Sequence, residues 1–249
     1  MLPGTSRPPK LVVFDLDHTL IACDATILWT EFLYEKKIVT DPIWRQYDRD
    51  MVKSYAKGVL DIRDFCRKHA GAFRSIPEEK LHALAQEFAK KKIAPLIFPD
   101  GKKWAKNALQ ANIPACVLSA SAAFIVKPIA KLFGLTDAMG IELAFKDGFC
   151  TGEIVGIPTF QEGKVERLSE RLAEAGIGFE DVLFFTDSRN DLPLAERAGY
   201  TVCVNPDAVL ESAARKNGWK VAEWKLSLRT QMTAQVDAKG VPETQTVRS

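Results

Sequence analysis

Acidic and polar side chains follow several apolar runs of this sequence, at the points where those runs end. They are Asp15, Asp17 and Thr19 after KLVVF, Ser119 in ACVLSAS, Lys164 at the start of GKVERLSERLAEAG, and Asp187, Asn190 and Asp191 at the end of DVLFFTDSRND. Carboxylates gathered at one place repel one another unless a cation lies among them, and oxygen ligands without Cys or His favour Mg²⁺. A lysine ammonium and a serine hydroxyl supply the charge and the hydrogen-bond donor that a phosphoryl group needs. The set therefore predicts phosphoryl chemistry at a magnesium site.

Each of these residues, taken alone, also has a structural explanation. Asp and Ser at the end of a strand commonly cap the following helix, and an acid in the first turn of a helix is favoured by the helix dipole. Lys164 alone reads as a solvated lysine in a first helical turn. The combination favours function, because the residue types are complementary and their order places all of them at one edge of one sheet.

The elements that would position these residues are short strands alternating with helices. The runs from Leu11, Ala115, Asp181 and Tyr200 are apolar at successive positions, which is typical of parallel strands covered on both faces. Helical spacing is found at 100–113, 124–134 and 163–176. We predict a doubly wound, Rossmann-like α/β domain, in which ligands bind outside the carboxyl ends of the strands.

Residues 24–95 do not follow this alternation. Amphipathic helices are predicted at 25–37, 47–58, 61–73 and 77–92, and their apolar residues Trp29, Phe32, Leu33, Leu81, Leu84 and Phe88 are expected to pack in the core. The chain is therefore predicted to divide into a discontinuous core (1–23 and 96–222), a helical cap (24–95) inserted after the first strand, and a tail from 223 with little apolar content, expected to be disordered. Asp147-Gly148 predicts a hairpin at one edge or over the mouth of the sheet.

Composition excludes several classes of protein. The chain has 249 residues, 47% of them apolar, and a net charge of +2 with no long basic block, so we expect no nucleic-acid partner. The five cysteines are scattered without a C-x-x-C pair, which favours free thiols in a reducing compartment. With no stretch approaching a membrane span and no signal-peptide core, we expect a cytoplasmic protein without a membrane partner, either a monomer or a homodimer.

The motifs DLDHT (15–19), the serine of VLSAS (119), the lysine of EGK (164) and TDSRND (186–191) resemble, in order and spacing, the four signature motifs of the haloacid dehalogenase superfamily. A helical cap between the first and second motifs is similar to the phosphoserine-phosphatase-like branch. TGEIVGIPTFQEGKVERL is similar to a bacterial group in that branch that includes histidinol-phosphate phosphatases. His18 fills a variable slot of the pattern, and Thr186 stands where many members have glycine.

The resemblance implies a role for each matching residue. Asp15 would be the nucleophile that forms an aspartyl-phosphate, and Asp17 the general acid and base. Mg²⁺ would be held by Asp15, the main-chain carbonyl of Asp17, and Asp187. Phosphate would be bound by Ser119, Lys164 and Asn190, with Thr19 and Asp191 in supporting positions. The second aspartate separates phosphatase from dehalogenase chemistry, since a departing halide needs no proton.

The identity of the substrate is predicted less directly, because the residues of the cap determine substrate specificity in such a fold. We expect a small amino-bearing phosphomonoester of amino-acid biosynthesis, histidinol phosphate or phosphoserine. His18 and Asp24 are candidate substrate contacts, as are Glu31 for an amine and Arg45, Arg49 or Arg63 for a carboxylate, although solvated helix faces explain most such charges. Three alternatives remain open: a phosphatase of a lipid headgroup such as phosphatidylglycerophosphate, a phosphotransferase, and a binding module without turnover.

Overall fold

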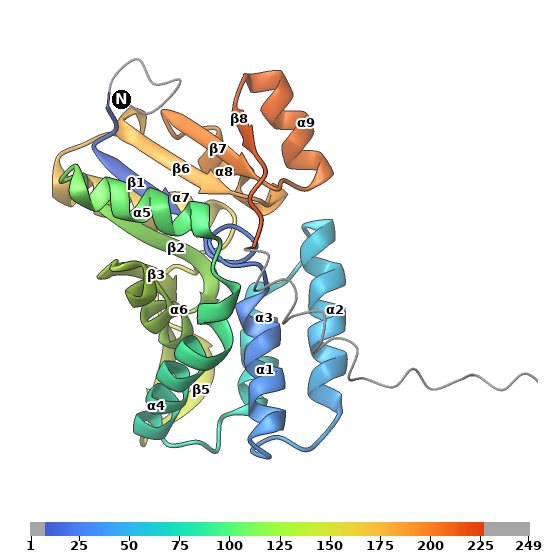
Figure 1. Ribbon diagram of the computed structural model, residues 1–249. Coiled ribbons are helices and arrows are strands. Elements are labelled where there is room, and N and C mark those ends of the chain that lie inside the picture. The colour runs from blue at the N-terminus through green and yellow to red at the C-terminus, as the bar shows by residue number, and fades with distance from the viewer. Residues whose placement is uncertain (1–7, 227–249) are drawn as a thin grey trace, which may run out of the picture.

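The computed structural model describes residues 8–226 and confirms the predicted α/β class. A six-stranded parallel sheet runs in the order β3-β2-β1-β6-β7-β8 (Figure 1). Its strands are β1 (Leu11–Phe14), β2 (Ala115–Ala122), β3 (Asp137–Ile141), β6 (Val182–Thr186), β7 (Tyr200–Val204) and β8 (Lys220–Ala222). From β1 the chain builds outward to β3 on one side and to β8 on the other. The carboxyl end of β1 therefore lies at the point where the strand order reverses, the usual ligand position in such sheets.

Helices cover both faces of this sheet. They are α5 (Pro99–Gln110), α6 (Ala123–Ala130), α7 (Glu162–Ala175), the single turn α8 (Leu192–Ala195) and α9 (Ala208–Asn217). Val12 and Phe14 share a core with α5 and α6, whereas Leu11 and Val13 share a second core with α7. Successive residues of β1 are thus buried on opposite faces, which explains why this strand is apolar at every position.

The predicted helical insertion lies between β1 and β2. It consists of α1 (Ala25–Glu35), α2 (Ile43–Lys57), α3 (Ile62–His69) and α4 (Glu78–Phe88). Trp29 of α1 packs against Phe88 of α4 and also against Phe124 of α6, with ring centroids 5.4 and 5.6 Å apart. These side chains belong to the same buried cluster as Phe14 of the sheet. The insertion therefore shares a continuous hydrophobic core with the sheet domain.

The predicted hairpin forms around Asp147-Gly148 as β4 (Leu143–Lys146) and β5 (Phe149–Ile154). It is a separate two-stranded sheet that begins two residues after the edge strand β3, and β5 packs against α3 of the helical insertion. The main-chain N–H of Glu78 donates to the carbonyl of Gly148, and a Cβ at Gly152 would lie 2.9 Å from the Cα of Arg67. Gly152 also has a φ of +83°, so this close contact requires glycine.

The first four residues of the predicted tail, 223–226, lie within the described part of the chain. The indole of Trp224 is buried against Phe98 and Phe185, and its main-chain N–H donates to Oδ1 of Asn205. Residues 227–249, the rest of the predicted tail, lie outside the described residues. Among helices within 8–226, none has the length and apolar content needed to cross a bilayer.

Candidate active site

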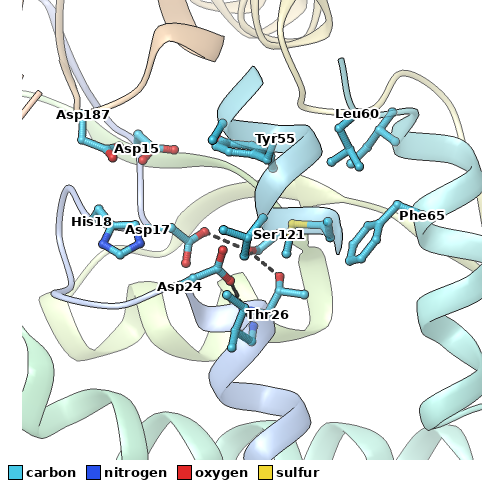
Figure 2. Close-up of a pocket in the computed structure, with 16 residues that line it drawn as sticks. Asp15, Asp17, His18, Asp24, Thr26, Tyr55, Leu60, Phe65, Ser121 and Asp187 are labelled. Atoms are coloured by element: carbon cyan, nitrogen blue, oxygen red, sulfur yellow. Dashed lines mark hydrogen bonds between the residues drawn. The ribbon is translucent and has the colours of Figure 1, made fainter. Parts of the chain in front are cut away.

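Two carboxylates lie side by side where the central strands end. Asp15 directly follows β1, and its main-chain N–H donates to the carbonyl of Phe185, which fixes Asp15 against β6. Asp187 directly follows β6, and its Oδ1 accepts a 3.2 Å hydrogen bond from the hydroxyl of Thr19. Figure 2 shows Asp15 and Asp187 at one side of a pocket. The structure thus brings the first and fourth predicted motifs together.

A buried lysine neutralises part of this charge. The ammonium of Lys164 lies 2.7 Å from Oδ1 of Asp15 and 2.7 Å from Oδ1 of Asp191, and only 1% of the lysine is exposed. The hydroxyl of Thr186 donates to Oδ2 of Asp191 at 2.7 Å. Thr186 therefore orients Asp191, and Asp191 in turn holds Lys164.

Burial and mutual repulsion shift the pKa values of the acidic groups. Burial raises the pKa of Asp15, Lys164 opposes this, and the charge of Asp17 raises it further. Burial also raises the pKa of Asp187, and the charges of Asp15 and Asp191 add to the effect. Burial also raises the pKa of Asp191, to about 6, against the opposing effect of Lys164. Burial alone would lower the pKa of Lys164, but Asp15 and Asp191 outweigh it and the net pKa is raised. The lysine is thus charged, and more carboxylates surround it than it can neutralise.

This excess of negative charge fits a divalent cation. Asp15 and Asp187 offer oxygen ligands of the kind that Mg²⁺ prefers, and a cation beside them would offset the burial that disfavours their ionised forms. No group of three or more His, Cys, Asp or Glu side chains within residues 8–226 is arranged to hold a metal. The expected set would not form such a group, because it has two carboxylates and the main-chain carbonyl of Asp17.

Asp17 lies beside Asp15 in the pocket, and its carboxylate faces the first turn of α1 (Figure 2). Its Oδ1 accepts a 2.6 Å hydrogen bond from the main-chain N–H of Ala25, and its Oδ2 accepts hydrogen bonds from Ser121 (2.8 Å) and Ser119 (3.2 Å). Burial raises the pKa of Asp17 to about 6, and repulsion from Asp24 adds to the effect. A carboxyl group that titrates near neutral pH is suited to proton transfer in both directions.

The pocket wall contains Ser121 rather than the predicted Ser119. Both serines lie on one face of β2, but Ser121 is nearer the carboxyl end and lines the pocket, whereas Ser119 is fully buried behind it. The hydroxyl of Ser119 bonds to Asp17 and accepts from the N–H of Ser121, so it holds the second serine in place. The sequence SAS could have indicated this difference, because two serines two residues apart lie on one face of a strand and the one nearer its carboxyl end lies nearer a ligand.

The pocket has a polar floor and an apolar roof. It encloses about 180 Å³ between the strand ends and the helices α1, α2 and α3. The polar part consists of Asp15, Asp17, His18, Asp24, Thr26, Ser121 and Asp187, and the remaining lining residues include Ile27, Met51, Val52, Tyr55, Leu60 and Phe65. Figure 2 shows Tyr55, Leu60 and Phe65 facing the carboxylates across the cavity. The sequence analysis did not single out these roof residues, because an apolar stripe on a helix predicts only burial.

Among the predicted substrate contacts, His18 and Asp24 line the pocket. Asp24 is the N-cap of α1, and its Oδ1 accepts from the N–H groups of Thr26 and Ile27. The other four candidates do not line this pocket. Arg45 forms a two-pronged ion pair with Glu31 at 2.7 Å on the outer surface, Arg49 bonds to Gln46, and Arg63 is an exposed residue of α3.

Asn190 is engaged elsewhere than at a phosphate. Its Nδ2 donates to the carbonyl of Tyr55 at 3.0 Å and to the hydroxyl of Ser188 at 3.3 Å, so both amide hydrogens are used. Asn190 does not line the pocket either. The predicted phosphate contact is therefore replaced by a contact with the last turn of α2.

Comparison with known proteins gives the family. A model of haloacid dehalogenase-like hydrolases matches residues 12–196. A histidinol-phosphatase of Neisseria meningitidis is 35% identical over 220 residues, which cover 87% of this chain and 99% of that protein. A phosphoserine phosphatase of Mycobacterium tuberculosis is 27% identical, with 90% of this chain and 75% of that protein covered.

Solved structures share the fold. A Bordetella pertussis protein of unknown function superposes with a TM-score of 0.78 at 30% identity, covering 86% of this chain and 98% of that one. A phosphoserine phosphatase captured as a phospho-aspartyl intermediate analogue superposes with a TM-score of 0.65 at 21% identity, covering 92% of this chain and 99% of that one. The chain belongs to the haloacid dehalogenase-like hydrolases, in the branch that contains histidinol and phosphoserine phosphatases, and it is a phosphatase.

Proposed function

We propose that this phosphatase hydrolyses a small amino alcohol phosphate, such as histidinol phosphate, through an aspartyl-phosphate and with Mg²⁺. The observation that carries the choice of substrate is the charge of the pocket. Asp24 lines it, while no Lys or Arg is among its lining residues in the described part of the chain. The pocket can therefore pair with an ammonium group but offers no arginine or lysine to a carboxylate.

In the first step the free Oδ2 of Asp15 attacks phosphorus, because Oδ1 is held by Lys164. The bond between phosphorus and the ester oxygen breaks, and the departing alkoxide takes a proton from the Asp17 carboxyl. With a pKa raised to about 6, a fraction of Asp17 carries that proton at neutral pH. The hydroxyl of Ser121, which lines the pocket, would donate to the phosphoryl oxygens. The buried ammonium of Lys164, which is bonded to Asp15, would stabilise them by its positive charge.

In the second step water attacks the phosphorus of the aspartyl-phosphate. Asp17, now ionised, accepts a proton from that water, and the bond between phosphorus and Asp15 breaks to release phosphate and the Asp15 carboxylate. Mg²⁺, when bound by Asp15, Asp187 and the carbonyl of Asp17, supplies positive charge for the phosphoryl oxygens. His18, with a φ of +55° and its N–H donating to the carbonyl of Cys23, shapes the loop that carries Asp17.

The amino group of the substrate would bind Asp24. Both hydrogen bonds of this residue use Oδ1, which leaves Oδ2 for an ammonium in the pocket. Phosphoserine carries a carboxylate as well, and that group would enter a pocket already lined by several acids. Like charges at such separations disfavour binding, so the pocket favours histidinol phosphate over phosphoserine.

A panel of phosphomonoesters tests this assignment. We expect kcat/KM for histidinol phosphate to exceed that for phosphoserine at least ~10-fold, with phosphoethanolamine and phosphocholine between them. Asp15→Asn should abolish turnover of every substrate. A preference for phosphoserine, or equal rates across the panel, would reject the amino alcohol assignment.

A matched pair of variants tests Asp24. Asp24→Asn keeps a good N-cap for α1 but loses the charge, so kcat/KM for histidinol phosphate should fall ~10- to 100-fold with little change for p-nitrophenyl phosphate. Glu31→Gln, which removes an acid of the same helix outside the pocket, is the control and should change neither. Product analysis with glycerol as a competing acceptor then distinguishes hydrolysis from phosphotransfer.

A further inference from the structure

The last turn of α2 is tied to the two loops that carry the phosphate site. Carbonyl groups at a helix C-terminus have free acceptor capacity, and here two of them accept hydrogen bonds from side-chain amides of the core domain. The carbonyl of Tyr55 accepts from Nδ2 of Asn190 at 3.0 Å, and the carbonyl of Gly58 accepts from Nε2 of Gln161 at 3.2 Å. The carbonyl of Tyr55 also accepts from the main-chain N–H of Gly58. The same turn of α2 supplies Tyr55 and Ala56 to the roof of the pocket.

The two amides also bond to each other. Nε2 of Gln161 donates to Oδ1 of Asn190 at 3.1 Å, so both hydrogens of the Gln161 amide are used. Asn190 donates its own hydrogens to Tyr55 and Ser188. This pattern fixes the orientation of both amides, because a flipped amide would place its oxygen against a carbonyl oxygen. Asn190 is 3% exposed, which strengthens the dependence on correct pairing.

The positions of these residues along the chain connect the roof with the catalytic groups. Gln161 directly precedes α7, which carries Lys164 in its first turn, and Asn190 lies next to Asp191. Gln161 has a φ of +49° and a ψ of −123°, an unfavourable region for a residue with a side chain. The ring of Phe160, one residue earlier, packs against Tyr55 with centroids 5.8 Å apart. Three contacts from two loops thus hold the same helical turn.

We propose that Gln161 and Asn190 form an amide latch that positions the roof of the pocket over the phosphate site. The latch holds the half-buried Tyr55 near the acidic groups of the site. Burial raises the pKa of its hydroxyl, and the charges of Asp191, Asp15 and Asp187 raise it further. The part of a substrate that extends beyond the phosphate would contact the roof, so binding of such a substrate would require the latch hydrogen bonds to be formed. Binding of a substrate that ends at the phosphate would not. Gln161 and Asn190 are thus positioning residues. Their effect on substrate binding rests on the proposed function.

Hydrogen exchange of the amides at residues 55–60 tests the latch without any substrate. Gln161→Glu has a similar length but lacks the two donors, and Gln161→Gly removes the amide while relieving the positive φ. Both variants should exchange ~10-fold faster than wild type at residues 55–60. Glu162→Gln, which keeps the size of the exposed neighbouring side chain and removes its charge, is the control. Its amides at residues 55–60 should exchange as in wild type.

Kinetics separates the latch from a general structural role. In both Gln161 variants we expect KM for histidinol phosphate to rise ~10-fold, with kcat/KM for acetyl phosphate within ~2-fold of wild type. Unchanged exchange at 55–60, or an equal loss with both substrates, would overturn the proposal. If wild type cleaves neither substrate, the proposed function fails, and the exchange measurement still decides whether the latch exists.

Discussion

The main-chain N–H of Ala25 donates a 2.6 Å hydrogen bond to Oδ1 of Asp17. Ala25 is the first residue of α1, and the next two N–H groups of this helix donate to Asp24. The N-terminus of the cap's first helix is therefore satisfied by the proposed general acid and by the proposed amine ligand. Because a helix N-terminus carries partial positive charge, it stabilises both acids where desolvation would otherwise disfavour their ionised forms.

Loss of Lys164 should destabilise the fold as well as stop turnover. Lys164→Met fills similar volume but leaves Asp15 and Asp191 buried without their counter-ion. We expect a loss of ~3–5 kcal/mol in the free energy of unfolding at pH 7, measured by urea denaturation. Lys68→Met, which breaks an exposed ion pair with Asp64, is the control and should leave the urea midpoint close to that of wild type. Equal effects of the two changes would contradict the buried charge network.

The two serines of β2 should separate in function. Ser121→Ala removes a hydroxyl on the pocket wall, and we expect kcat/KM for p-nitrophenyl phosphate to fall ~100-fold. Ser119→Ala removes a buried hydroxyl that bonds to Asp17 and to the N–H of Ser121, so ~1 kcal/mol of stability should be lost with a smaller kinetic effect. A larger kinetic effect at Ser119 would restore the assignment made from the sequence.

Magnesium should stabilise the protein independently of turnover. A divalent cation between Asp15 and Asp187 relieves the repulsion that, with burial, raises their pKa values. We expect saturating Mg²⁺ to raise the Tm by several degrees, as ~2–3 kcal/mol of binding free energy implies for a domain of this size. EDTA should reverse the shift and remove activity, and Asp187→Asn should abolish the shift. A Tm that does not respond to Mg²⁺ would contradict the metal assignment.

Asp48, in the interior of the helical insertion, gives a pH dependence of stability. Burial raises the pKa of this carboxyl from its usual 3.8 to about 7. Nε2 of His69 lies 3.6 Å from Oδ1 of Asp48, and burial lowers the pKa of His69 to about 4. Other groups that act on Asp48 are Thr30, Asp24, Glu31 and Arg49. Between pH 4 and 7 the folded state therefore holds a proton on Asp48 that the unfolded chain has lost, so the contribution of Asp48 to stability falls as pH rises.

Comparison with Asp48→Asn isolates this effect, since His69 is present in both proteins. The stability of wild type relative to the variant should fall by ~2 kcal/mol between pH 5 and pH 8, measured from urea midpoints. A difference that stays constant across this range would show that Asp48 does not hold its proton in the fold.

The sequence by itself determined the fold class, the helical insertion and the order of the strand-end residues. Parallel strands such as β1 are apolar throughout, and helices such as α7 show a clear period of 3.6 residues, so local patterns were sufficient. The edge strands β3 and β8 were not predicted, because DAMGI and KVA are short and carry weak patterns. Asp15, Asp187 and Lys164 converge as predicted because strand ends of one parallel sheet meet at one edge.

Tertiary structure alone decided which polar groups face the pocket. Ser119 and Ser121 share one face of β2 and differ only in depth. Asp24, the N-cap of α1, differs from Glu31 in its position along the helix, which places it at the strand ends. Asn190 has the residue type of a phosphate ligand, yet its amide hydrogens are taken by the carbonyl of Tyr55, 135 residues away in the sequence, and by Ser188. Which polar groups face the pocket depends on how separate elements pack against one another. A local sequence pattern does not contain the positions of hydrogen-bond partners that come from distant elements.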